Sequence, residues 1–177
     1  MLWGTGLLDS GVVSLELLAT ADRRAARVRL GVPARTAARV AMSDLLLYTT
    51  TPVSPNSLDA VRDSALATDV VPASRALGVF WELYGLRPEG EPAQFTLTVE
   101  QIQIGWVRRA AERLGITDPT TGLRVQWEEV PQRVNEIAGR GVRVDLSRLR
   151  PGRYRIQVLV TINGEAPVTA ERDVLVQ

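Results

Sequence analysis

Two adjacent carboxylates, Glu128 and Glu129, are the residues of this sequence whose types best suggest acid–base chemistry, for example on a sugar next to Trp127. Adjacent residues of an extended strand point to opposite faces of a sheet. The two carboxyl groups therefore cannot converge on one glycosidic bond, as hydrolysis requires. The pattern favours a solvated strand end, and we predict no catalytic residue and no enzyme.

Three aspartates, Asp59, Asp63 and Asp69, are the candidate ligands for a calcium ion. Asp59 and Asp63 are spaced four residues apart with Arg62 beside them, which is typical of the charged surface of a helix. The sequence has no histidine and no cysteine. It therefore excludes Ser-His-Asp and Cys-His nucleophile systems, zinc sites built on these residues, and disulfides. We predict no metal and no cofactor.

Arginines crowd the last third of the chain. They are Arg140, Arg143, Arg148, Arg150, Arg153 and Arg155. If Arg143, Arg153 and Arg155 converge, they form a surface for phosphate, an acidic glycan or an acidic protein. The alternative, which we favour, is that Glu171 and Asp173 on the next strand neutralise these side chains across a hairpin. That alternative predicts that Arg155 pairs with Asp173 or Glu171.

Aromatic residues could stack on sugar rings. Trp81 and Trp127 lie on apolar faces of alternating segments, which favours a place in the core. Trp106 begins a segment with helical spacing. It is therefore the one possible exposed stacking residue.

The composition limits the kinds of partner and location that this protein can have. The 177 residues carry 21 basic and 20 acidic side chains, so no global field attracts nucleic acid or an anionic membrane. No apolar run approaches the roughly 20 residues of a membrane-spanning helix. The first residues lack the basic and apolar regions of a signal peptide. The location is therefore unknown: envelope or secreted if the chain is a fragment of a longer one, otherwise cytoplasmic.

Strict alternation of apolar and polar residues predicts that the last third of the chain forms β-strands. Tyr154 to Ile162 alternates apolar and polar residues, Asn163-Gly164 supplies a turn, and the chain returns along residues 168–176. Residues 142–146 alternate in the same way, so we expect a three-stranded meander. Arg172 falls on the apolar face, which predicts a bulge or a side chain that snorkels to the rim.

The segment Leu149-Arg150-Pro151-Gly152-Arg153-Tyr154 resembles the corner before the penultimate strand of immunoglobulin-like and fibronectin-type domains. In that corner a tyrosine hydroxyl bonds to nearby backbone and fixes the crossing between sheets. We therefore expect the Tyr154 hydroxyl to be buried and bonded to backbone near Leu149 or earlier.

The remaining segments complete a sandwich. Seven strands are expected from residue 40 onward, with a central strand at residues 77–84 that is covered on both faces. Two short helices are expected, one capped by Ser57 and one running from Trp106 to Gly115. A change of alternation at Ile102 predicts a bulge there. The fold class is thus all-β: an immunoglobulin/fibronectin-like antiparallel β-sandwich with short helical insertions and an N-terminal β-hairpin.

The N-terminal hairpin spans residues 11–32, and each of its strands alternates apolar and polar residues. Residues 1–39 are expected to form this hairpin and a linker, and residues 40–177 the sandwich. A lone two-stranded hairpin is marginal in water. We therefore expect a cover for its apolar face and a tendency of the full chain to self-associate.

Three motifs occur in order: Ser43-Asp44-Leu45-Leu46-Leu47, then residues 80–86 (FWELYGL), then the Pro-Gly-x-Tyr corner. Together they resemble the C-terminal β-rich region of uncharacterised bacterial proteins that also carry a GWxTD domain. The GWxTD motif itself is absent, because Gly105-Trp106-Val107-Arg108 departs from it after two residues. The resemblance implies no catalysis.

The sequence thus predicts a non-catalytic structural or protein-interaction module of a larger bacterial, envelope-associated protein. Its partner would be another protein or domain, or a second copy of the chain. The alternative is a β-sandwich module that binds a carbohydrate or an anion.

Overall fold

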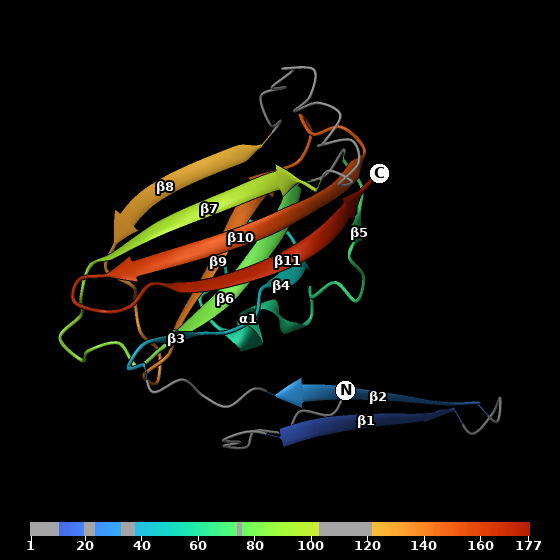
Figure 1. Cartoon of the computed structure of the whole chain (residues 1–177), viewed down its shortest axis with the longest axis horizontal. Coiled ribbons are helices and arrows are strands. Elements are labelled where there is room, and N and C mark those ends of the chain that lie inside the picture. Colours follow the sequence, from blue (N-terminus) through green and yellow to red (C-terminus); the bar gives the residue numbers. More distant parts are fainter. Residues whose placement is uncertain (1–10, 20–23, 33–37, 74–75, 103–121) are drawn as a thin grey trace, which may run out of the picture. The chain divides into compact units, whose positions relative to one another are not determined.

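The computed structural model describes residues 11–19, 24–32, 38–73, 76–102 and 122–177 (Figure 1). The chain divides into two units, Met1–Ala37 and Ala38–Gln177. This division lies two residues before the boundary expected from the sequence. Arg39, which the sequence places in a linker, bonds to residues of the second unit and belongs to it.

The first unit contains the predicted hairpin. Strands β1 (Gly11–Ala19) and β2 (Arg24–Val32) pair antiparallel, with Val13 opposite Leu30 and Leu17 opposite Ala26. The alternation read from the sequence therefore matches the register of the two strands.

The second unit is a β-sandwich, as predicted. One sheet has the order β5 (Val70–Val71), β11 (Val168–Val176), β10 (Gly152–Ile162), β7 (Ala93–Gln101) and β8 (Leu123–Glu129). The other is built on β6 (Ala76–Tyr84), which has β3 (Ala41–Met42) and β4 (Leu46–Thr49) on one edge and β9 (Ala138–Asp145) on the other. The seven expected strands are all present, the first of them split into β3 and β4. The short β5, which pairs parallel with β11, was not predicted.

The expected meander is wrong. Strand β9 pairs with β6 in one sheet, whereas β10 pairs with β7 and β11 in the other. The chain crosses between the sheets at the turn closed by the Leu149 amide and the Leu146 carbonyl, 2.9 Å apart. Alternation alone does not reveal this, because a strand with one buried face has the same pattern in either sheet.

The predicted tyrosine corner follows that crossing. Tyr154 is fully buried, and its hydroxyl donates a 2.9 Å hydrogen bond to the Arg150 carbonyl. The acceptor lies one residue later than expected. The bond fixes the chain where it enters β10.

The main core lies between the sheets. Its largest side chains come from the inner faces of β6, β7 and β10 and include Trp81, Phe95 and Ile156, each at most 1% exposed. The Trp81 and Phe95 ring centroids lie 6.2 Å apart. No polar or charged residue is buried in the described part of the chain, so hydrophobic contact supplies the stability of this core.

A second, smaller core covers the outer face of β6, which confirms that this strand is buried on both sides. Phe80 packs there with Tyr48 and with Val61 of helix α1 (Leu58–Arg62). The helix begins at Ser57 as predicted, because the Ser57 hydroxyl accepts a 3.3 Å bond from the Ala60 amide.

Glycines let this outer layer approach the sheet. A Cβ atom on Gly78 would lie 2.4 Å from the Tyr48 ring, and one on Gly141 would lie 2.5 Å from Pro55. The Gly141 amide also donates a 2.8 Å bond to the Pro55 carbonyl. Gly78 therefore makes room for the ring of Tyr48, which lies opposite it on β4, and Gly141 lets Pro55 lie against β9.

Arg172 shows which of its two predicted alternatives holds. The β10–β11 register runs without a bulge, with Ile156 opposite Arg172. The half-buried Arg172 side chain reaches the Leu45 carbonyl at 3.2 Å on the other sheet. It snorkels to the rim because its stem follows the core face while its guanidinium needs a polar partner.

Strand β7 ends at Gln101, just before the bulge expected at Ile102, and the Ile102 amide bonds to the Arg153 carbonyl at 2.8 Å. Ile104 and the second helix lie in residues 103–121, outside the described residues.

We expect Tyr154→Phe to lower the free energy of unfolding by about 1 kcal/mol without changing the fold, because it removes one buried hydrogen bond. Urea titration followed by circular dichroism measures this change. An unchanged midpoint would show that the corner bond adds no net stability.

Gly78→Ala should destabilise the sandwich by roughly 1–3 kcal/mol, because the added methyl group displaces the Tyr48 ring. Gly31→Ala is the matched control, since a Cβ there meets nothing within 4 Å. Thermal unfolding of the two variants should show a lower midpoint for Gly78→Ala only. Equal midpoints would contradict the close approach of Tyr48.

The self-association expected from the hairpin remains a prediction. Light scattering should give a mass that rises with concentration for residues 1–177 and a constant monomer mass for residues 38–177. A constant monomer mass for both chains would remove the hairpin as an association element.

Candidate functional site

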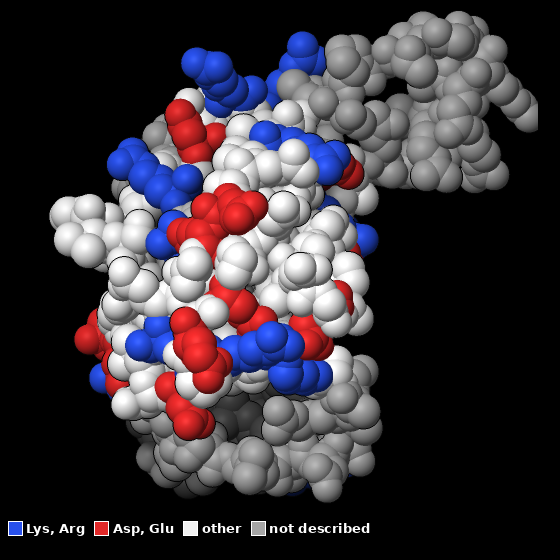
Figure 2. Space-filling view, turned by 90° about the vertical axis from the view of Figure 1, so that its left-hand side faces the viewer, with Lys and Arg blue, Asp and Glu red and all other residues white. Residues whose placement is uncertain are grey.

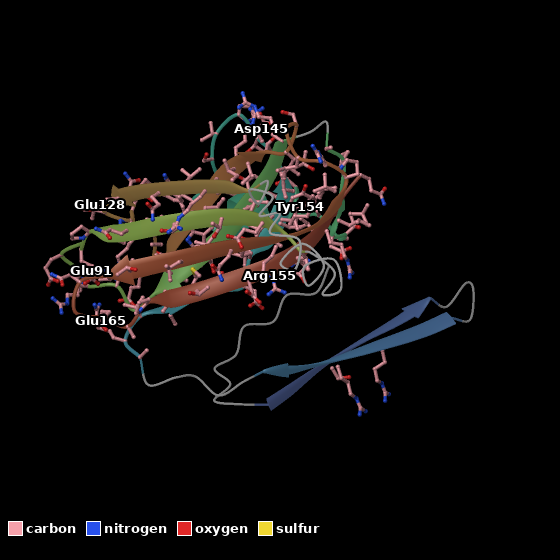
Figure 3. All side chains as sticks on the ribbon, turned by 45° about the horizontal axis from the view of Figure 1, so that its top comes forward. Glu91, Glu128, Asp145, Tyr154, Arg155 and Glu165 are labelled. Carbon is pink, nitrogen blue, oxygen red and sulfur yellow. The ribbon has the colours of Figure 1, made fainter. Side chains whose placement is uncertain are left out.

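The three arginines that could have formed one anion-binding surface do not converge. Arg143 lies on β9 in one sheet, whereas Arg153 and Arg155 lie on β10 in the other (Figure 3 labels Arg155). The Arg155 guanidinium bonds to Asp173 at 2.8 and 3.2 Å and lies 3.3 Å from Glu171. The predicted pair across the hairpin is confirmed, and the converging surface is corrected, because the register places Arg155 opposite Asp173.

The surface charges are mixed in the same way elsewhere. Figure 2 shows arginine and acidic side chains interspersed on the end of the sandwich that carries the β10–β11 turn. This agrees with a formal net charge of +1. Long-range attraction of a polyanion has no support from this surface.

The other candidate residues also have simple roles. Glu128 bonds to Gln94 at 3.4 Å, whereas Glu129 pairs with Arg140 at 2.8 Å, so the two carboxylates diverge as predicted. Asp59 and Asp63 are almost fully exposed beside Arg62. The residues that the structure describes contain no cluster of metal-binding side chains. Trp106 lies outside the described residues.

The tryptophans predicted for the core differ in their burial. Trp81 is completely buried, whereas Trp127 is only half-buried on the edge strand β8. The Trp127 ring stacks on Phe95, with centroids 5.1 Å apart and planes 9° apart. One face of Trp127 is therefore already covered by protein.

Strand β8 marks the side on which the core is open. The inward-facing residues of β7, the neighbouring strand, are closed to solvent: Phe95, Leu97 and Val99 are at most 3% exposed. On β8, by contrast, Val125 is 44% exposed. Sequence alternation gives both strands the same apolar face, so it could not separate a central strand from this edge strand.

A cleft of about 240 Å³ opens along this edge between β8 and β9. Its lining residues are Leu97, Leu123, Val125, Trp127, Arg140, Val142, Arg143 and Val144. We call this set the β8–β9 cleft. It contains six apolar side chains and two arginines, and it has no carboxylate or hydroxyl.

The ion pair between Arg140 and Glu129 bridges the two sheets at one end of the cleft. Beyond the bridge lies a second hollow of about 340 Å³, lined mainly by the segments that leave β8 and enter β9. Arg140 lines both hollows. The two hollows therefore follow one edge of the sandwich, on either side of the bridge.

A tight turn joins β8 to β9. The amides and carbonyls of Val134 and Ile137 bond to each other at 2.8 and 3.1 Å around Asn135 and Glu136. Both turn residues have positive φ, 51° and 69°, as a type I′ turn requires. In the segment 130–137 that joins β8 to β9, Val130 and Val134 are exposed, at 56% and 46%. Among the six large apolar residues that are exposed in the described ranges, three thus follow one another along this edge.

Two buried hydrogen-bond donors at this edge lack an acceptor. The Trp127 Nε1 and Arg140 Nε groups are buried and have no hydrogen-bond acceptor among the described residues. Both side chains line the β8–β9 cleft. A buried donor without an acceptor costs about 1–3 kcal/mol.

The lining of the cleft consists of apolar side chains and two arginines. None of its lining side chains acts as a nucleophile or general base near neutral pH. Apolar walls supply contact area, and the two arginines supply positive charge at the rim.

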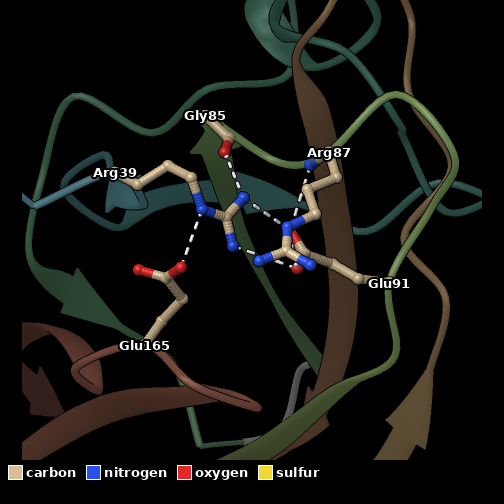
Figure 4. Close-up of polar contacts among 5 residues, drawn as sticks. All are labelled: Arg39, Gly85, Arg87, Glu91 and Glu165. Carbon is tan, nitrogen blue, oxygen red and sulfur yellow. Dashed lines mark hydrogen bonds and ion pairs between the residues drawn. The ribbon is translucent and has the colours of Figure 1, made fainter.

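An ion cluster around Arg39 fixes the beginning of the sandwich (Figure 4). Arg39 donates to Glu91 at 2.8 and 3.0 Å, to Glu165 at 2.8 Å, and to the Gly85 carbonyl at 2.7 Å. Glu91 and Glu165 belong to the turns after β6 and β10 and lie at one end of the sandwich (Figure 3). The hydrogen bond from Arg39 lowers the pKa of Glu91 below its ordinary value.

Comparison with known proteins gives no identification. No protein-family model and no curated protein matches this sequence. Among solved structures, the PmoD soluble domain from Methylocystis sp. ATCC 49242 (Rockwell) aligns with a TM-score of 0.35 and 14% identity over 75% of this chain and 89% of that chain. A family 123 glycoside hydrolase from Clostridium perfringens aligns with a TM-score of 0.32 and 11% identity over 76% of this chain and 27% of the hydrolase. Likeness at this level transfers neither a ligand nor an activity.

The Glu91 pair predicts a specific pH dependence. Because the folded-state pKa of Glu91 is lowered, the stability linked to its charge is present at neutral pH and is lost as the pH falls through that folded pKa. Glu91→Gln should therefore lower the unfolding midpoint at pH 7, and the difference from the natural chain should shrink below about pH 4. Asp59→Asn, which removes one partner of an exposed ion pair, is the control. It should leave both the unfolding midpoint at pH 7 and its pH dependence unchanged. A difference that is constant with pH would contradict the charge linkage.

Proposed function

We propose that this protein is a non-catalytic protein-interaction module that binds a segment of its partner along the open β8 edge. The observation that carries the proposal is the exposure of inward-facing Val125 over the β8–β9 cleft, while the matching residues of β7 are closed. Exposed apolar surface that is concentrated on one edge marks an interaction site.

Two further features support this proposal. The lining of the cleft holds no carboxylate, hydroxyl, thiol or imidazole side chain. Strand β8 pairs only with β7 in the described part of the sheet, so its outer edge still offers backbone donors and acceptors. None of the helices in the described ranges is long and apolar enough to cross a membrane.

The wider context follows the sequence and stays part of the proposal. The buried Tyr154 corner favours an immunoglobulin-like type of sandwich. The resemblance to the β-rich region of GWxTD-domain-containing proteins favours a module of a larger bacterial, envelope-associated protein.

A display library of random twelve-residue peptides, selected on the full chain, tests the proposal. Selected peptides should lose binding to Val125→Glu, which places a charge in the β8–β9 cleft. They should keep binding to Val53→Glu, the matched control at a valine that is 79% exposed and does not line the cleft. Failure to enrich any peptide, or equal binding to both variants, would overturn the proposal.

A further inference from the structure

We infer that the open β8 edge pairs with the β8 edge of a second copy of this chain, antiparallel and centred on Gln126. This inference rests on the proposed function, because it names the segment that binds along β8. In the resulting dimer each copy closes the exposed edge of the other.

The free backbone of β8 can accept such a partner. Strand β8 is the last strand of its sheet (Figure 1) and pairs with β7 from Leu123, opposite Val99, to Glu129, opposite Ala93. Its other edge has no partner strand among the described residues. An identical edge supplies the missing donors and acceptors, and two-fold symmetry makes the two β8 strands antiparallel.

The two faces of β8 restrict the register. Val125 and Trp127 face inward, because their partners on β7 are buried residues. The residues that alternate with them, Arg124, Gln126 and Glu128, point outward and are exposed. Directly opposite residues of an antiparallel pair share one face of the sheet, so inward residues must oppose inward residues. Only a register centred on a residue meets this condition.

The outward face of β8 is complementary to itself. With Gln126 on the two-fold axis, Arg124 of each copy lies directly opposite Glu128 of the other. Among the described residues, Arg124 makes no ion pair, and Glu128 bonds only to Gln94, at 3.4 Å. Both charges are therefore available, and the dimer contains two opposite-charge pairs on one face.

The inward face matches as well. Val125, which is 44% exposed, lies opposite the half-buried Trp127 of the other copy, and the same contact recurs across the axis. A β-branched residue opposite an aromatic residue is a favourable cross-strand pair. Leu123 lies opposite Glu129, whose charge is already held by Arg140 of its own chain at 2.8 Å. No like charges meet on this face.

Other registers lose the match of charges. Centring the pair on Val125 places Arg124 opposite Gln126, and centring it on Trp127 places Glu128 opposite Gln126. A centre at Arg124 or at Glu128 places that residue opposite its own copy, which is repulsive. Charge therefore selects the Gln126 register.

The other sheet edges are less suited to a second copy. The Pro55 carbonyl accepts a hydrogen bond from β9, and residues 64–66 bond to the outer edge of β4. On β11, Arg172 is an inward-pointing charge, which protects a sheet edge. A β11 pair would also bring Glu171 and Asp173 of two copies together. Association is therefore favoured at β8.

Charge reversal tests the dimer, with sedimentation velocity of the full chain as the measurement. The natural chain should show a reversible monomer–dimer equilibrium. Arg124→Glu and Glu128→Arg should each weaken it by about tenfold, because each creates two like-charge pairs across the axis. An equimolar mixture of these two variants should dimerise again, because every reversed residue then opposes its complement.

Arg150→Glu is the matched control, since it makes the same change of charge at an exposed arginine outside β8. It should leave the equilibrium unchanged. A natural chain that stays monomeric up to millimolar concentration would overturn the inference. A mixture that dimerises no better than either variant alone would do the same.

Gln126→Cys tests the register. The chain has no cysteine, and opposite Cα atoms of an antiparallel pair lie about 4.5–5.5 Å apart, within reach of a disulfide. Mild oxidation should therefore convert this variant to a covalent dimer on a non-reducing gel. Glu128→Cys is the control, because its two copies lie about 14 Å apart along the strands. Equal cross-linking of the two variants would overturn the Gln126 register.

The competing explanations have separate signatures. Association through the N-terminal hairpin alone leaves residues 38–177 monomeric and is insensitive to charge reversal on β8, whereas pairing through β8 makes residues 38–177 dimeric. Either hairpin result would overturn this inference. If the full chain stays monomeric while display-selected peptides bind it and not Val125→Glu, the proposed function stands and this inference fails.

Discussion

The burial of β6 on both faces is the constraint on which the rest of the sandwich depends. Its inner face supplies Trp81 and Val79 to the core between the sheets, and its outer face supplies Phe80 to the small core beneath α1. Both faces must be closed, because a strand that is apolar on each side would otherwise expose a large hydrophobic surface. Gly78 and Gly141 permit this closure by letting Tyr48 and Pro55 approach the backbone.

The segments that cover β6 also cover some edges of the two sheets and leave others uncovered. Residues 50–66, which cover the outer face, also bring Pro55 to the edge of β9. On the opposite sheet, β5 pairs with β11 and shortens that edge. Natural sheets block edges in these ways to prevent pairing with other chains. Strand β8 has no such block in the described ranges, and the core is open to solvent beside it, at Val125.

Charged groups in this protein act at the rims and ends rather than in the core. Arg39 joins the first residues of the sandwich to two distant turns, and Arg140 joins the two sheets beside the open edge. Arg155 is neutralised by its hairpin partner. Each of these arginines keeps its stem against the protein and its guanidinium near carboxylates, so the positive charge is locally balanced. Arg143 differs from these three, because it makes no ion pair in the described ranges.

The sequence by itself determined the strands, their buried faces and the tyrosine corner, because alternation, turn residues and the Pro-Gly-x-Tyr segment are local properties. It also predicted the pairing of Arg155 with Asp173, since a hairpin fixes which residues oppose each other. Tertiary structure alone decided that β9 joins β6 rather than β10, because both pairings bury the same face of the strand. It also decided that Leu123, Val125 and Trp127 line an open edge and that Arg140 reaches Glu129 across it. An apolar face is encoded residue by residue, but whether another sheet covers it depends on strand order, which no local pattern specifies.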